Sequence, residues 1–87
     1  MPYIPVMRRG KIDLIAGELS EEARSDGELN YAITSLLIEH FASTDGIYSY
    51  STFERIVGLL ECVKLEFYRR LIAPFEDGKK EENGDVF

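Results

Sequence analysis

Binding chemistry is most concentrated at Tyr68, Arg69 and Arg70, three adjacent residues late in the sequence. A guanidinium group holds a phosphate or carboxylate through two parallel hydrogen bonds, and a nearby aromatic ring can stack on a flat ligand. Lys64 and Tyr31 offer a further cation and a further ring. These five residues predict a binding site for a small anionic, nucleotide-like ligand.

The two arginines cannot share one role. Adjacent positions on a helix diverge by about 100°, so both guanidinium groups cannot enter one pocket of the same subunit. We expect one of Arg69 and Arg70 to bind the ligand and the other to pair with Glu66 or Glu76. A structural alternative is that both simply complement the dipole at the end of a helix.

Two other polar groups lie close to apolar positions. Glu61 needs a partner at the edge of an apolar interface, and Lys64 is three residues further on. The pair could be an ion pair that fixes the register of an oligomer, or part of a ligand contact. Asn30, Tyr31 and Thr34 could likewise form either a hydrogen-bond network or a recognition surface.

The sequence contains too few residues of the types that catalysis or metal binding requires. The chain has one histidine, His40, and one cysteine, Cys62, whereas a zinc site needs three or four ligands. Glu61 and Glu66 are five residues apart, which is not the spacing of helical carboxylate metal sites. We therefore predict a non-catalytic protein without metal or cofactor, in which Cys62 is a small buried side chain.

Composition restricts the partners and the compartment. The net charge of −6 over 87 residues opposes the counterion release that drives DNA and RNA binding. No apolar run approaches the roughly 20 residues that span a bilayer, and no signal peptide is evident. A single cysteine leaves no internal disulfide. We expect a cytoplasmic protein that binds neither nucleic acid nor membrane.

Apolar periodicity predicts an all-α fold, a single domain over residues 1–87. Three helices are expected near 7–24, 28–43 and 51–73, the last being the longest. Asp26 is expected to cap the second helix, and Ser51 with Glu54 forms a capping box for the third. Pro74 predicts a kink or stop before a charged tail, 76–87, while residues 1–6 form an apolar arm.

The last helix carries two apolar stripes at 100° per residue. One stripe suits packing within the chain and consists of Phe53, Ile56, Val57, Leu60, Val63, Phe67 and Leu71. The other predicts a homo-oligomer interface and consists of Leu65, Tyr68, Ile72 and Phe75. The competing explanation is that the apolar arm folds back over this second stripe.

Four segments of the chain are distinctive: MPYIP, GELNYAIT (27–34), GLLECVKLEFYRR (58–70) and ENGDVF (82–87). They resemble a family of small proteins of unknown activity from bacterial, archaeal and phage genomes. The resemblance implies a compact helical protein and carries over no activity, cofactor or catalytic residue.

Two functions of different classes are compatible with these observations. The first is an oligomeric binding protein that sequesters a small anionic ligand at a subunit interface, as phage counter-defence proteins do. The second is a purely structural or protein-interaction oligomer. A ligand would raise the melting temperature of the first and leave that of the second unchanged.

Overall fold

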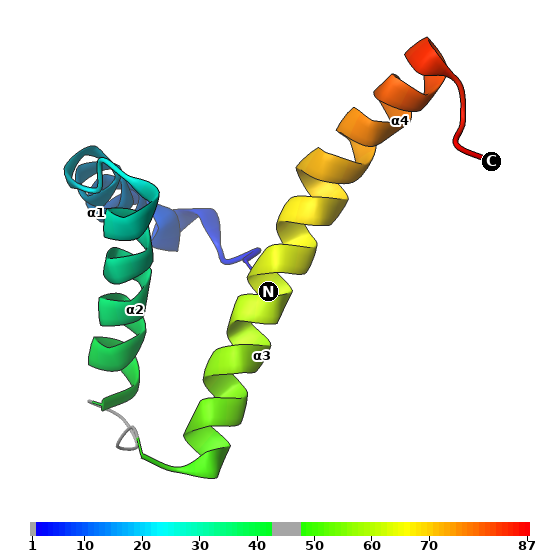
Figure 1. Cartoon of the computed structure of the whole chain (residues 1–87). Coiled ribbons are helices and arrows are strands. Elements are labelled where there is room, and N and C mark those ends of the chain that lie inside the picture. Colours follow the sequence, from blue (N-terminus) through cyan, green and yellow to red (C-terminus); the bar gives the residue numbers. More distant parts are fainter. Residues whose placement is uncertain (1, 43–47) are drawn as a thin grey trace. The chain divides into compact units, whose positions relative to one another are not determined.

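The regular structure of the chain is entirely helical in the residues that the computed structural model describes, 2–42 and 48–87. Figure 1 shows the helices along the sequence. In order, they are the short 3-10 helix η1 (Val6–Arg8), α1 (Arg9–Glu22), α2 (Asp26–Ala42), α3 (Tyr50–Phe67), the π-helical segment η2 (Tyr68–Ile72) and α4 (Ala73–Asn83). The prediction of an all-α fold is confirmed.

Contacts within the chain define two compact units, Met1–Ile56 and Val57–Phe87. The first contains η1, α1, α2 and the first turns of α3. The second contains the remainder of α3, η2, α4 and the last residues. Among the described residues no helix is both long enough and apolar enough to cross a membrane.

The apolar arm is attached to the start of α1. The Arg9 side chain donates from Nε and Nη2 to the carbonyl oxygen of Ile4, at 3.0 and 2.8 Å. The backbone N–H of Arg8 donates to the Pro5 carbonyl at 2.9 Å, which closes η1. One guanidinium group therefore satisfies an exposed carbonyl and fixes the direction in which the arm leaves the helix.

Ser25 caps α2. Its Oγ accepts the backbone N–H of Glu28 at 3.1 Å and also contacts Glu28 Oε2 at 3.3 Å. A serine hydroxyl satisfies a free N–H in the first turn of a helix, as a capping residue must. The prediction that Asp26 caps this helix is wrong by one residue, because Asp26 is already inside the first turn. The predicted end of the helix at Ser43 lies outside the described residues.

Ser49 caps α3, two residues before the expected Ser51. The Ser49 Oγ accepts the backbone N–H of Thr52 at 3.1 Å and lies 2.9 Å from the Thr52 hydroxyl. The backbone N–H of Phe53 donates to the Ser49 carbonyl at 3.0 Å. The predicted Ser51–Glu54 capping box is therefore wrong, since both residues lie within the helix.

Removing the Ser49 hydroxyl is expected to destabilise the protein by about 1 kcal/mol, the usual cost of losing a serine cap. Ser49→Ala tests this, and Ser51→Ala is the matched control because Ser51 lies inside α3. Urea denaturation at one protein concentration measures the difference. Equal losses in the two variants would contradict the assignment of Ser49 as the cap.

Pro74 is accommodated by a π turn and does not end the helix. The backbone N–H of Ala73 donates to the carbonyl of Tyr68, five residues earlier, and Pro74 lies in the first turn of α4. Proline lacks an N–H and its ring clashes with the carbonyl four residues before it, so a locally wider turn relieves both problems. The chain, for which a kink or stop is predicted at Pro74, instead stays helical to Asn83.

The π turn also rotates every later residue. A π turn contains one residue more than an α turn, so the positions after it shift by about 100° around the helix. Phe75 consequently leaves the stripe of Leu65, Tyr68 and Ile72, where uniform α-helical spacing had placed it. It aligns instead with Phe67 and Leu71, and Lys79 lies 5.6 Å from the centre of its ring.

The packed centre of the first unit is small. Phe41, at the end of α2, is 4% exposed, and its ring lies 5.1 Å from the Arg55 guanidinium carbon and 5.0 Å from the His40 ring. Thr52 is the buried polar side chain beside the α3 cap. Cys62 is exposed, so the prediction that it is buried is wrong.

Candidate functional site

One face of the second unit gathers the side chains that most suit recognition. Helical spacing, with the rotation at η2, places nine residues of this unit within about 100° of arc. We call it the Tyr68 face; it consists of Glu61, Lys64, Leu65, Tyr68, Ile72, Ala73, Glu76, Lys80 and Asn83. Its centre is apolar and its two ends are charged.

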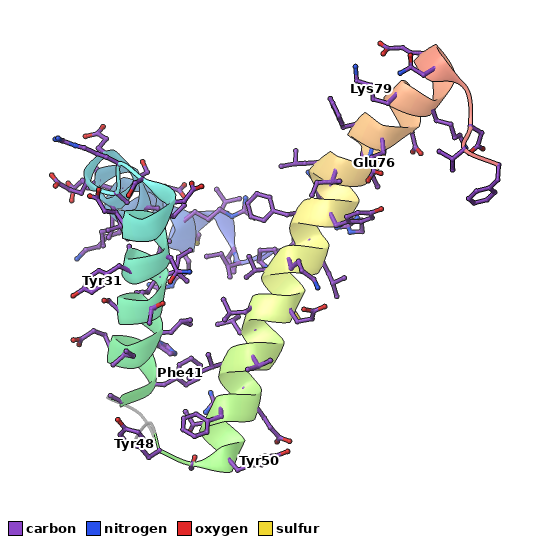
Figure 2. The ribbon with its side chains drawn as sticks, in the orientation of Figure 1. Tyr31, Phe41, Tyr48, Tyr50, Glu76 and Lys79 are labelled. Atoms are coloured by element: carbon purple, nitrogen blue, oxygen red, sulfur yellow. The ribbon has the colours of Figure 1, made fainter. Side chains whose placement is uncertain are left out.

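A pocket of about 480 Å³ occupies the C-terminal half of this face. It is lined by Tyr68, Ala73, Glu76, Asp77, Lys79, Lys80, Asn83, Gly84, Asp85 and Val86. Figure 2 labels Glu76 and Lys79 on α4. That Tyr68 shares this pocket with Ala73, Glu76 and Lys80 agrees with the rotation at η2, because uniform α-helical spacing would separate Tyr68 from them.

The chain turns sharply at Gly84 to complete the pocket. The backbone N–H of Gly84 donates to the Lys80 carbonyl at 2.9 Å, and Gly84 has φ of 87°, a conformation that favours glycine. Past this turn, Asp85 Oδ2 lies 3.7 Å from Lys80 Nζ. The last residues are thereby held beside α4, where Asp85 and Val86 line the pocket.

The charges of the pocket favour a cationic group over an anion. Three carboxylates line it, those of Glu76, Asp77 and Asp85, against the two ammonium groups of Lys79 and Lys80. Lys79 Nζ also lies 3.2 Å from the Glu82 carboxylate, outside the lining, and Lys80 is near Asp85. The pocket can therefore hold a positive side chain and an apolar contact with Tyr68.

The residues predicted to bind an anionic ligand are not brought into one site within either unit. Lys64 and Tyr68 share the Tyr68 face, but Lys64 Nζ lies 3.0 Å from Glu61 Oε1. Arg69 and Arg70 are rotated from Tyr68 by about 100° and 200° at α-helical spacing. Tyr31 is on α2, in the first unit, and is 74% exposed.

One arginine pairs with a glutamate, as expected. Arg69 Nη2 lies 2.8 Å from Glu66 Oε1, one turn earlier on the helix. The polar edge of α2 also contains a predicted contact, because Thr34 Oγ1 donates to Asn30 Oδ1 at 3.3 Å. Both contacts join neighbouring turns of one helix, so neither by itself defines a ligand site.

Sequence reasoning missed the pocket residues after Pro74. Glu76, Lys80 and Asn83 were assigned to a charged tail, although their spacing of four and three residues is that of one helical face. This spacing was the available signal. The described residues contain no group of three or more His, Cys, Asp or Glu side chains that could hold a metal ion.

The structure is that of a small all-helical protein with a charged and apolar face on its longest helical stretch. Residues 1–86 match the family model described as a domain of unknown function, DUF6899, and the chain belongs to this family. No curated protein and no solved structure matches the chain.

Proposed function

We propose that this protein is a non-catalytic homo-oligomer that uses the Tyr68 face of its last helix as the contact surface. One observation carries the proposal: the second unit is a single helical stretch followed by four residues, and none of its described side chains is buried. Within this unit, no second element is present to cover a helix that has apolar side chains on opposite sides.

The apolar centre of the Tyr68 face gives a strong reason for association. Leu65, Tyr68 and Ile72 are 55%, 51% and 45% exposed. Full burial of a leucine or isoleucine side chain contributes about 1.5 to 3 kcal/mol. A symmetric pair contains two copies of each side chain, so each position contributes this amount twice. A second copy of the chain supplies the same apolar surface in return.

Thermal unfolding at a series of protein concentrations tests this function. Association that stabilises the folded chain makes the melting temperature rise with concentration, because mass action favours the associated state. We expect such a rise across a hundredfold range of concentration. A melting temperature independent of concentration over that range would contradict the proposal.

We propose sequestration of a small anion as a second function, with Arg69 or Arg70 as the ligand-binding arginine. The contact of 2.8 Å between Arg69 Nη2 and Glu66 Oε1 supports a division of roles between the two arginines, because it is the kind of pair expected for one of them. The ligand would lie at the edge of the subunit interface, with Tyr68 or Tyr31 as the flat contact. Lys64 would add positive charge. The alternative function, that of an oligomer whose partners are only proteins, needs no ligand-binding site.

Separate replacement of the two arginines distinguishes these roles. We expect one of Arg69→Ala and Arg70→Ala to cost a few tenths of a kcal/mol of stability, the usual effect of a pair on one helix, and to leave ligand binding unchanged. The other variant is expected to keep the oligomer and to abolish the rise in melting temperature that a nucleotide produces. If no nucleotide in a panel stabilises the native protein, the ligand-binding function is wrong and the protein-only oligomer is favoured.

A further inference from the structure

The charges of the Tyr68 face are arranged so that the face complements itself when one copy is reversed. From the start of the face to its end, Glu61 and Lys64 come first, then the apolar side chains, then Glu76 and Lys80. The order of charge is negative, positive, apolar, negative, positive. Reversing a second copy therefore sets each charge of the face opposite a charge of the other sign.

The spacing supports this pairing quantitatively. Lys64 and Glu76 each lie six residues from position 70, and Tyr68 and Ile72 each lie two residues from it. Glu61 and Lys80 lie nine and ten residues from it, a mismatch of one residue or about 1.5 Å along the helix. One two-fold axis near residue 70 thus relates three pairs at once.

The positions around the helix agree with the same axis. A two-fold axis perpendicular to two antiparallel helices places the same edge of the face from both copies on the same side of the interface. A residue on one edge therefore meets a residue on the same edge of the other copy. Lys64 and Glu76 lie on one edge, separated by about 20° of arc, and Glu61 and Lys80 lie at nearly the same angle. Uniform α-helical spacing would place Glu76 about 120° from Lys64 and destroy this match.

We infer that two copies of this chain pack antiparallel through the Tyr68 face, with Lys64 opposite Glu76 and Glu61 opposite Lys80. Tyr68 of each copy packs on Ile72 of the other. The inference rests on the proposed homo-oligomer and adds its orientation and register. Helices packed side by side lie about 8 to 10 Å apart, within reach of these long side chains.

The pocket on α4 acquires a role in this arrangement. Reversal brings the start of the face on one copy over the pocket of the other, so the Lys64 ammonium group approaches Glu76. The excess of carboxylates in the pocket matches that charge. Glu61 of the same copy approaches Lys80. The Lys64–Glu61 and Lys80–Asp85 pairs are exposed, and exposed pairs rearrange at little cost.

Thiol cross-linking between copies tests the orientation. The full chain with Cys62→Ser serves as background, and Lys64→Cys and Glu76→Cys are made in it separately. The antiparallel pair predicts that a short thiol-specific cross-linker joins the two variants when they are mixed and leaves each variant alone largely uncross-linked. A parallel pair predicts the reverse, because each position would then meet itself.

Glu81→Cys is the matched control for Glu76→Cys, because residue 81 lies on the same helix but is rotated by about 140° from residue 76. It should not cross-link to the Lys64→Cys variant. The mass of the native chain is measured in parallel. A dimer in which each variant links to itself, or in which no pair links, overturns the antiparallel face, whereas a monomer overturns the proposed homo-oligomer as well.

Discussion

Ile72→Asp is expected to dissociate the native oligomer and raise its dissociation constant at least about a thousandfold. The apolar contribution of Ile72 is lost and a carboxylate is placed at the centre of an apolar contact. A two-fold pair suffers both effects twice, and every 1.4 kcal/mol corresponds to a factor of ten in the constant. Light scattering or sedimentation of the variant at the concentration of the native oligomer measures the change.

Cys62→Asp is the matched control for Ile72→Asp. It adds the same charge to the same helical stretch at an exposed position, rotated by about 110° from the middle of the Tyr68 face. We expect this variant to retain the native mass. A variant at Ile72 that keeps the native mass, while the one at Cys62 dissociates, would show that the contact surface lies on another side of the helix.

Phe41→Ala is expected to destabilise the first unit by about 3 to 5 kcal/mol, the usual cost of replacing a buried phenylalanine by alanine. Phe41 is the buried apolar side chain of this unit, and its ring contacts both Arg55 and His40. A domain of this size is only marginally stable, so this loss of stability would leave much of the protein unfolded at room temperature.

Urea denaturation at one fixed protein concentration measures the effect of Phe41→Ala, because association otherwise changes apparent stability. Tyr31→Ala, on the same helix and mostly exposed, is the control and should cost well under 1 kcal/mol. Equal stability losses in the two variants would mean that Phe41 does not form the packed centre of this unit.

The helices and their apolar spacing could be predicted from the sequence, because a 3.6-residue period over 15 or more residues is a strong signal. The capping residues were harder to predict. Ser25 and Asp26, or Ser49 and Ser51, are chemically similar candidates within two residues, and only the backbone geometry decides which oxygen reaches a free N–H.

The π turn at Tyr68–Ile72 is the feature that the sequence could not show. Proline within a helical pattern predicts a break, and whether the chain breaks or widens by one residue depends on backbone energies that spacing alone does not reveal. This one residue decides whether Phe75 or Glu76 belongs to the Tyr68 face. With uniform α-helical spacing the surface would be an apolar stripe. With the extra residue of the π turn it is a face whose charges complement those of a reversed copy.

The predicted arginine site combines residue types that are adjacent in the sequence. Tyr68, Arg69 and Arg70 are adjacent in sequence, yet a helix directs neighbours to different sides, and Arg69 contacts Glu66. The pocket, by contrast, uses residues spaced three and four apart, a pattern that a purely helical interpretation of residues 73–83 would have detected.

The mass of the native chain in solution tests the central claim most directly. Sedimentation equilibrium over a range of micromolar concentrations is expected to give twice the chain mass of 9.9 kDa, with dissociation on dilution. A constant mass of 9.9 kDa over the whole range would contradict the homo-oligomer, because the apolar centre of the Tyr68 face would then have to be covered within a single chain.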